Sequence, residues 1–409
     1  NPQSPIPNPQ SPIPNILINK NHFELFNKIN YLNIKNIINY SFILYLKMSV
    51  ILSILKCYYI INFIHTNLAY YVLRKYYRKI TYKEKETGKE ISVQEKYAPL
   101  VPTDSINYFS FVFFGMVFYP IRNIFFLIIF YTLPLHIKIL KLIYKNHETD
   151  ENQRKKIERA ASFWINLYFI LNNFTVTKLN LDYKDIYKKY LGEDYDFEQK
   201  DFGLYISNHI GYLEIITYMR EYGLGLLITY ELSRAPGLGR SMLAMGSFFI
   251  NREDEKSRSN ALKILEKRAN DFYNKKSFVK TLIFPEGTTT NGQYIAGFKK
   301  GAFISLLPVK PLMVKPCEGF VLQTNRYFSF VRTLASFKLK VEFADLPVIK
   351  PTEYMFEKYK HLGKEKWEIY ANVVNKMYAE IGGFKQCNIR FRDRVLYQKI
   401  SEDGYYKDE

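Results

Sequence analysis

The sequence predicts an α/β protein in which a β-sheet flanked by helices follows two apolar N-terminal segments. From about residue 200 onward, short apolar strands alternate with longer amphipathic helices, which is the pattern of an α/β domain. Upstream, the segments 48–73 and 108–137 carry one lysine or arginine each, Lys56 and Arg122. The 409 residues are enough for one such domain with appendages.

The charge and the cysteine content exclude several classes of protein. A formal net charge of +19 implies an anionic partner, such as a lipid surface, a nucleic acid or a phosphate-rich ligand. No RNA- or DNA-binding signature accompanies the charge, so we expect no nucleic acid partner. The three cysteines are far apart and no CxxC occurs, which argues against a disulfide scaffold and a zinc ribbon. No histidine pairs with an acid or a cysteine at ligand spacing, so we expect no metal site.

Residues 1–47 differ from the rest of the chain. The heptapeptide NPQSPIP occurs at 1–7 and again at 8–14, followed by a stretch rich in Asn, Ile and Lys. Such a density of proline predicts a low-complexity, disordered extension. Met48 is the first methionine, and translation that begins there is the alternative interpretation.

Residues 48–107 are predicted to contain an apolar helix with a basic collar. The helix would end near Leu73, and the collar follows between Arg74 and Lys85. This arrangement is typical of a membrane anchor whose collar faces the cytosol. An interfacial helix and a buried core helix remain alternatives.

Residues 108–150 are predicted to form a membrane hairpin. A straight helix over 108–137 would reach roughly 45 Å, well beyond the hydrocarbon core. Pro120 removes a backbone donor near its middle, and each half alone is too short to span. We therefore expect a hairpin that enters and leaves on one face, with a single tilted span as the alternative. Basic residues between Lys138 and Lys156 favour a cytosolic downstream chain.

Residues 151–350 are predicted to form the main domain and residues 351–409 a C-terminal helix and tail. The strand candidates are 203–207, 226–230, 247–250, 280–284, 312–320 and 338–343, with helices at 212–221, 257–273 and 298–306. A later helix at 364–381 has apolar residues at spacings of three and four, which marks a core-facing surface.

His209 and Glu214 are the candidate catalytic pair. His209 follows the strand candidate 203–207, and Glu214 falls in the first turn of the next helix. On one continuous helix the two side chains would point about 140° apart. They can meet only if His209 lies on the turn before the helix. The carboxylate would then fix the imidazole tautomer and free the other ring nitrogen to take a proton. Ser207 is the nearest candidate nucleophile, because a strand would point it to the same face as His209.

Two further features follow strand candidates. FPEGTTTNG at 284–292 begins at the carboxyl end of a strand, where α/β folds place ligands. Its threonines could offer hydroxyls and amides to a polar ligand, and Glu286 could hold an arginine or a substrate hydroxyl. In FFINRED at 248–254, Arg252 lies just past a strand and is suited to bidentate phosphate binding.

In this order, these blocks resemble the signature of the glycerolipid (lysophospholipid) acyltransferase superfamily. The resemblance rests on Asn208-His209 with Glu214, Phe249 to Arg252, Phe284 to Thr288, and the proline-bearing block at 306–316. It covers roughly residues 100–350. FKKGAFISLLPVKP (298–311) and EGTTTNG are similar to the lysophosphatidylcholine and lysophosphatidylethanolamine acyltransferase branch.

The resemblance implies a fold, an activity and a site. The fold would be the mixed β-sheet flanked by helices of that superfamily, preceded by membrane helices or a re-entrant hairpin. The activity would be transfer of an acyl group from acyl-CoA to a lysophospholipid hydroxyl, without a cofactor, on the cytosolic face of the endoplasmic reticulum. An anionic membrane surface would be a further partner. His209 and Glu214 would be catalytic, and the substrate-binding residues would be Asn208, Arg252, Glu286, Gly287, Thr288 and Thr289.

One residue departs from the family pattern. Glu214 stands where the family usually has aspartate, so its arm is one methylene longer, and Glu214→Asp is expected to be tolerated or to improve activity. Three alternatives stay open. The enzyme could acylate 1-acylglycerol 3-phosphate or glycerol 3-phosphate, or the chain could be a catalytically silent membrane scaffold.

Overall fold

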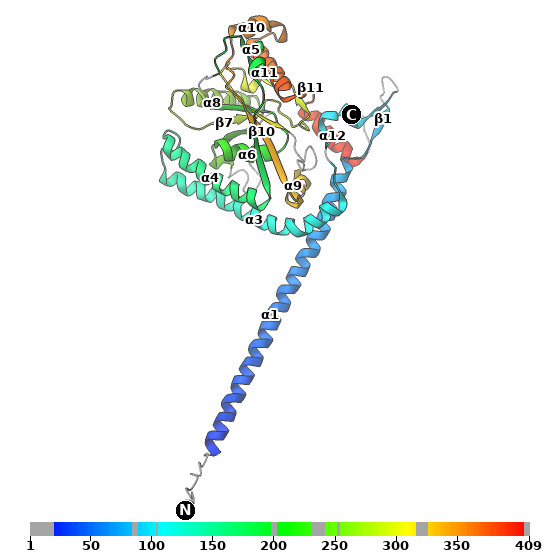
Figure 1. Ribbon diagram of the computed structural model, residues 1–409, viewed down its shortest axis with the longest axis vertical. Helices are drawn as coiled ribbons and strands as arrows, with labels where there is room; N and C mark the ends of the chain where they lie inside the picture. The colour runs from blue at the N-terminus through cyan, green and yellow to red at the C-terminus, as the bar shows by residue number, and fades with distance from the viewer. Residues whose placement is uncertain are drawn as a thin grey trace, which may run out of the picture. The chain divides into compact units, whose positions relative to one another are not determined.

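The computed structural model describes residues 20–83, 89–103, 105–197, 203–230, 242–251, 254–315 and 326–404. The chain divides into two units, residues 1–61 and residues 62–409. In the first unit the described residues form the N-terminal part of helix α1 (Lys20–Lys75), which is drawn in Figure 1. Every other helix and strand belongs to the second unit.

Helix α1 begins inside the segment that the sequence predicts to be disordered. It starts at Lys20, so the prediction of disorder is wrong for residues 20–47. The physical reason is that proline is confined to the first 14 residues of this segment and glycine is absent from it. Residues 1–19 lie outside the described part of the chain. The predicted collar begins in the last turn of α1, at Arg74 and Lys75.

Helix α3 (Tyr108–Ile143) runs unbroken through Pro120 and Pro134, so the predicted hairpin within 108–137 is wrong. One face of α3 packs on α4 (Glu151–Leu171) and α9 (Arg326–Ala335), which holds the helix together despite its prolines. Arg122 donates hydrogen bonds to the carbonyls of Leu171 and Leu334, both at 3.0 Å. A helical hairpin is formed instead by the consecutive helices α3 and α4, which pack against each other. Among the described residues, Asn39–Lys75 and Tyr108–Ile143 are long and apolar enough to cross a membrane.

The centre of the second unit is a seven-stranded mixed sheet in the order β3-β10-β9-β4-β7-β5-β6. The strands are β3 (Phe174–Leu179), β4 (Leu204–Ser207), β5 (Gly225–Thr229), β6 (Phe248–Ile250), β7 (Thr281–Ile283), β9 (Lys310–Lys315) and β10 (Leu339–Asp345). β9, β4, β7, β5 and β6 are parallel, β10 is antiparallel to β9, and β3 is parallel to β10. The predicted mixed sheet is thereby confirmed.

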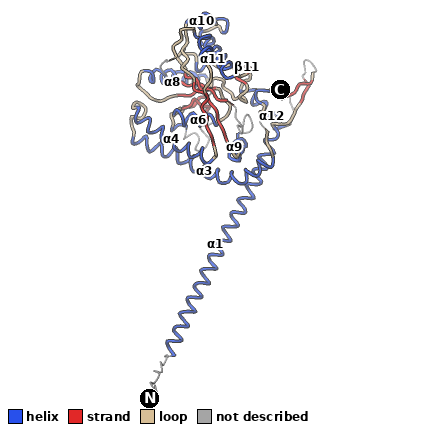
Figure 2. Tube along the Cα trace, viewed as in Figure 1, coloured by secondary structure: helices blue, strands red, loops and turns tan. Residues whose placement is uncertain are grey.

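Helices cover both faces of this sheet, as Figure 2 shows in blue around the red strands. One face packs against α3, α4, α9 and α6 (Leu213–Tyr222). The other packs against α5 (Lys184–Leu191), α8 (Glu255–Tyr273), α10 (Glu353–Lys358) and α11 (Lys366–Gly382). Residues of β4 alternate between the two cores, with Tyr205 in the first and Leu204 and Ile206 in the second.

The predicted strands all have a counterpart in the sheet, and α11 has the predicted buried face. Residues 316–320 of the strand candidate 312–320 lie outside the described residues. The sequence missed β3. The helix expected at 298–306 is reduced to a short 3-10 helix, Lys300–Ala302. Small elements complete the unit: β1 (Thr81–Lys83), β2 (Glu90–Ser92), α2 (Val93–Lys96), the 3-10 helices Ala98–Leu100 and Lys360–Leu362, β8 (Tyr294–Ala296), β11 (Lys385–Cys387) and α12 (Phe391–Asp403).

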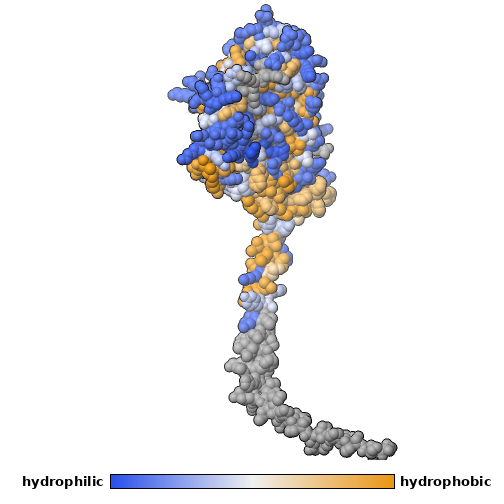
Figure 3. Space-filling view, turned by 60° about the vertical axis from the view of Figure 1, so that its left-hand side comes forward, coloured by the Kyte–Doolittle hydropathy of each residue, from blue (hydrophilic) through white to orange (hydrophobic). Residues whose placement is uncertain are grey.

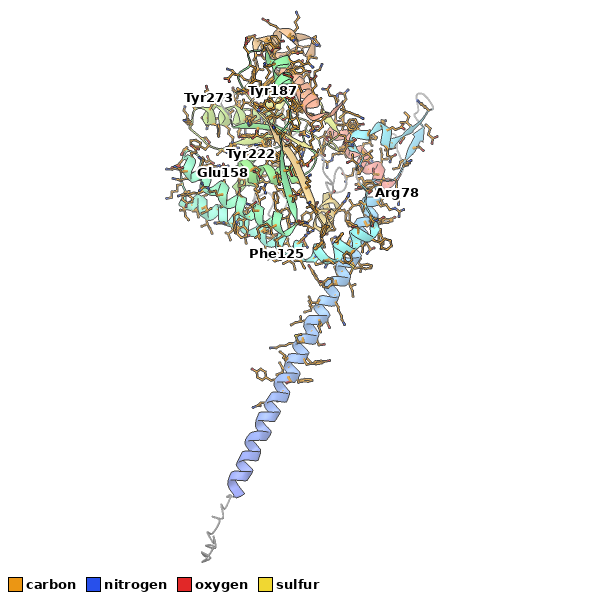
Figure 4. All side chains as sticks on the ribbon, in the orientation of Figure 1. Arg78, Phe125, Glu158, Tyr187, Tyr222 and Tyr273 are labelled. Atoms are coloured by element: carbon orange, nitrogen blue, oxygen red, sulfur yellow. The ribbon has the colours of Figure 1, made fainter. Side chains whose placement is uncertain are left out.

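The outer face of α3 is apolar and exposed. Its exposed side chains include Phe109, Phe113, Ile121, Phe125, Ile128, Tyr131 and Leu135. Figure 3 shows apolar side chains in orange gathered on the part of the second unit where Figure 1 places α3, and Phe125 is labelled in Figure 4. A continuous exposed apolar surface of this kind is typical of a contact with a membrane or another protein.

Candidate active site

The turn between β4 and α6 brings His209 and Glu214 together. β4 ends at Ser207 and α6 begins at Leu213, so His209 lies on the turn and Glu214 in the first turn of the helix. His209 Nδ1 is 2.7 Å from Glu214 Oε1, which is the geometry that the spacing requires. Five residues of separation are bridged because the chain turns before the helix starts.

The environment of Glu214 fixes the tautomer of His209. Glu214 Oε1 also accepts hydrogen bonds from the backbone N–H groups of Ile210 at 3.1 Å and Gly211 at 2.9 Å. A carboxylate is an acceptor, so Nδ1 carries the proton and Nε2 keeps its lone pair in the neutral imidazole. The Glu214 side chain is fully buried, and its Oε2 has no hydrogen-bond partner among the described residues.

The imidazole itself is held against an aromatic ring. The rings of His209 and Phe284 are stacked with their centroids 4.0 Å apart. The His209 side chain is 21% exposed, while that of Glu214 is 0% exposed. The histidine is therefore the member of the pair that a substrate can reach. The sequence placed Phe284 in the FPEG block but assigned it no role.

The turn at 284–292 cradles the main chain of His209. Glu286 Oε1 accepts a hydrogen bond from His209 N at 2.7 Å, and Oε2 accepts one from Ala296 N at 2.7 Å. Thr290 N donates to the His209 carbonyl at 2.9 Å. Glu286 is fully buried, and both of its oxygens accept hydrogen bonds from backbone amides. Its predicted contact with an arginine or a substrate hydroxyl stays a prediction.

Burial raises the pKa of Glu286 to about 8. The two backbone hydrogen bonds act in the opposite direction, and the nearby Glu214 carboxylate adds to the rise in pKa. Two acidic side chains thus flank His209, with Glu214 on its ring and Glu286 on its backbone.

The other residues of the turn point inward. Gly287 has a φ of +64°, a conformation that favours glycine, and an added Cβ would lie 2.9 Å from Lys299 Nζ. Thr288 and Thr289 are buried, at 3% and 6% exposure. Thr288 Oγ1 has no hydrogen-bond partner among the described residues, so it retains a free donor and acceptor.

Asn208 and Ser207 are fully buried and hydrogen-bonded within the fold. The Asn208 amide donates to the Val314 carbonyl and accepts from Val314 N, both at 2.8 Å, and the residue is fully buried. Its predicted contact with substrate stays a prediction. Ser207 Oγ donates to the Asn208 carbonyl at 2.9 Å and lies 3.1 Å from the Tyr218 hydroxyl. Because β4 ends at Ser207, the strand alternation does not extend to His209. Arg252 lies outside the described residues.

Comparison with known proteins finds similarity over part of the chain. Residues 192–317 match the family model described as Acyltransferase. A lysophospholipid acyltransferase of Arabidopsis thaliana, LPEAT2, is 29% identical over 201 residues, covering 48% of this chain and 35% of the relative. A second from the same plant, LPEAT1, is 27% identical over 202 residues, covering 48% of each chain. This chain therefore spans about a third to a half of the length of these relatives.

Two further similarities extend across organisms. Human lysophosphatidylcholine acyltransferase 1 is 26% identical over 199 residues, covering 47% of this chain and 35% of the relative. Among solved structures, the 1-acyl-sn-glycerophosphate (LPA) acyltransferase PlsC from Thermotoga maritima aligns with a TM-score of 0.40. The alignment has 17% identity and covers 64% of this chain and 97% of that one.

Proposed function

We propose that this chain, whose residues 192–317 match the family model described as Acyltransferase, transfers a fatty acyl group from acyl-CoA to the free hydroxyl of a lysophospholipid. The observation that carries the proposal is the hydrogen bond of 2.7 Å between His209 Nδ1 and the buried Glu214. It leaves Nε2 of a partly exposed imidazole as the proton acceptor. The relatives that the chain resembles are named lysophospholipid acyltransferases.

In the proposed reaction His209 is a general base and then a general acid. Nε2 takes the proton of the acceptor hydroxyl as its oxygen attacks the thioester carbonyl of acyl-CoA. The new C–O bond replaces the C–S bond, and the proton passes from the imidazolium to the departing thiolate, giving free CoA. Glu214 stays anionic and stabilises the imidazolium between the two transfers. No external oxidant, metal or cofactor is required.

Direct transfer is favoured over an acyl-enzyme intermediate. Ser207 is the nearest hydroxyl in sequence, but it is fully buried and bonded to the Asn208 carbonyl and the Tyr218 hydroxyl. An acyl chain could not reach Ser207 without opening the core. The two substrates therefore have to meet at Nε2 of His209.

A lysophospholipid that bears a head group is the proposed acceptor, in preference to 1-acylglycerol 3-phosphate or glycerol 3-phosphate. A phosphomonoester carries up to two charges and favours an extra arginine, whereas a phosphodiester carries one. Residues 288–290 are three threonines where an arginine-bearing turn is common in the family, so these positions add no positive charge to the site. A turn without that additional positive charge suits the singly charged ligand.

The acceptor would reach the site from a membrane on which the protein sits. The exposed apolar face of α3 offers the contact, and the net charge of +19 favours an anionic cytosolic surface, as at the endoplasmic reticulum. A lysophospholipid is already resident in such a bilayer. Its hydroxyl would then approach His209 at the membrane surface.

The test is acyl-CoA turnover by the full chain in membranes with a panel of lysolipid acceptors. His209→Ala should lower turnover by about 10²–10⁴-fold, which is what general-base catalysis typically contributes. His361→Ala changes an exposed histidine and is the matched control. Equal turnover by the two variants would remove His209 from the mechanism. Absence of turnover in the wild-type chain would favour a catalytically silent scaffold.

Competition decides the acceptor. Lysophosphatidylcholine, lysophosphatidylethanolamine and lysophosphatidic acid are offered at equal concentration to one membrane preparation. If lysophosphatidic acid is acylated ten times faster than both others, the assignment of the acceptor is wrong while the acyltransferase proposal stands.

A further inference from the structure

We infer that Asn291 is a positioning residue that joins the catalytic turn to a segment outside the family-matching domain. That segment, residues 97–101, is called the strap here. The inference rests on the proposed function for its catalytic consequence, and its contacts are observed independently of that function. Asn291 itself touches neither His209 nor Glu214 in any hydrogen bond among the described residues.

Asn291 binds the strap through three hydrogen bonds. Its backbone N–H donates to the Pro99 carbonyl at 2.7 Å. Its side-chain Nδ2 donates to the carbonyls of Ala98 at 2.9 Å and Val101 at 3.0 Å. Asn291 Oδ1 accepts from Gln293 N at 3.2 Å, so every side-chain hydrogen-bonding group is used. The residue is 2% exposed. Buried amides with this many partners fix the position of the backbone around them.

The three hydrogen bonds between Asn291 and the strap, called the clamp here, lie next in sequence to the contact between Thr290 and His209. Thr290 N donates to the His209 carbonyl at 2.9 Å, and Thr290 Oγ1 donates to the Tyr294 carbonyl at 2.8 Å. Displacing Asn291 therefore moves the amide that holds His209. Glu286, earlier in the same turn, holds the other side of the same residue through His209 N.

The strap is anchored on its far side by the C-terminal helix. Tyr97 and Leu100 are buried in a small core with Tyr76, Tyr397 and Ile400. The Tyr397 ring faces those of Tyr76 and Tyr97, and its hydroxyl donates to the Tyr76 carbonyl at 3.2 Å. The strap is thus held between α12 and the catalytic turn.

The consequence is that the placement of His209 depends on residues before α3 and after α11. Both lie outside residues 192–317. A loose strap would leave the substrates' own contacts intact but would allow the histidine to shift. Misplacement by about 1 Å can cost about 10²-fold in rate. A fall in kcat with unchanged KM is the signature of such a defect.

Asn291→Asp in the full chain tests the clamp. Aspartate keeps an oxygen for Gln293 N but loses both donors to the strap and places an anionic oxygen against two carbonyls. We expect kcat to fall by about 10- to 100-fold, with KM for acyl-CoA and for lysophosphatidylcholine each within twofold of wild type. Asn172→Asp is the matched control, because Asn172 is 1% exposed and its Nδ2 donates to the Tyr168 carbonyl at 2.8 Å. This control should keep kcat within threefold.

A double-mutant cycle separates the strap from general instability. Tyr397→Ala removes the ring that anchors the strap, so it should lower kcat through the same displacement. Because both changes release the strap, the double variant that combines Tyr397→Ala with Asn291→Asp should have about the same kcat as the less active of the two single variants. Multiplicative effects, or a normal kcat in Asn291→Asp, would overturn the inference.

Hydrogen exchange provides a readout that does not need turnover. In Asn291→Asp, but not in Asn172→Asp, amide protection should fall in peptides covering 97–101 and 284–293 together. Unchanged protection in both peptides would exclude the clamp even if the proposed activity holds. Lost protection in a chain without turnover would retain the clamp and reject the proposed function.

Discussion

Replacing Glu214 tests how much of the proposed catalysis depends on its charge and how much on its length. Glu214→Gln keeps the length and removes the charge, whereas Glu214→Asp keeps the charge and shortens the side chain. The carboxylate is fully buried and bonded to His209 Nδ1 at 2.7 Å, so solvent screens neither change. The two variants therefore separate the two contributions.

The expected magnitudes follow from this geometry. In the transition state the imidazolium and the carboxylate have charge centres about 4 Å apart, worth about 4 kcal/mol at an effective dielectric constant of about 20. Loss of that energy lowers the rate by about 10³-fold. In Glu214→Asp the arm is about 1.5 Å shorter, so the contact would lengthen to about 4 Å unless the start of α6 moves. We expect a loss of about 10- to 100-fold.

The assay is release of CoA thiol at saturating acyl-CoA and lysophosphatidylcholine, with the thermal midpoint measured on each variant. Glu221→Gln is the matched control, because Glu221 is exposed on the same helix. A Glu214→Gln variant within threefold of wild type would refute the proposed role of the charge. A fully active Glu214→Asp variant would refute the argument from length. The sequence favoured that tolerance, and the 2.7 Å contact reverses the expectation.

Three further predictions follow from other parts of the structure. Ser207→Ala should keep turnover within threefold, and labelled acyl-CoA without acceptor should leave no acyl group on the protein; a stable adduct at Ser207 would establish a two-step route. Burial raises the pKa of Glu286 from 4.5 to about 8, so the folded chain retains a proton that the unfolded chain releases. The resulting stability is present below about pH 4.5 and is lost as the pH rises towards 8, so thermal midpoints should fall across that window and fall less in Glu286→Gln; equal slopes would contradict this assignment. Ile128→Glu on the exposed face of α3 should reduce binding to lipid vesicles without lowering the thermal midpoint, whereas Val395→Glu, at an exposed apolar residue of α12, should not; equal binding by both would reject α3 as the contact.

The sequence was sufficient to predict the local geometry of His209 and Glu214, the candidate catalytic pair. A strand, a turn and a helix in succession constrain five residues strongly, and only the turn position of His209 lets it reach Glu214. The same local reasoning located the strands that precede the other blocks. These inferences needed no knowledge of which strands are neighbours.

The sequence was insufficient where a polar residue finds its partner far along the chain. Asn208 bonds Val314 on β9, which only the order of the strands makes a neighbour of β4. Glu286 bonds two backbone amides, yet in the sequence it reads as a residue available to a ligand. Buried polar groups need partners, and partners supplied by the backbone leave no pattern of residue types. The same limit applies to α3, where contacts with α4 and α9 keep the helix continuous despite Pro120.

The family-matching residues 192–317 do not contain all that places His209. Within them Glu286 holds the histidine, but its second oxygen is bonded to Ala296, whose carbonyl accepts from Asn375 of α11 at 2.8 Å. β8, which contains Ala296, pairs with β11 from the C-terminal part of the chain. In the sheet, β9 is hydrogen-bonded to β10, and β10 to β3. Both β10 and β3 lie outside residues 192–317. A fragment limited to 192–317 would therefore expose the β9 edge of the sheet. It would also lose Asn375 and β11, the partners of the segment that binds Glu286, and Glu286 accepts the hydrogen bond from His209 N.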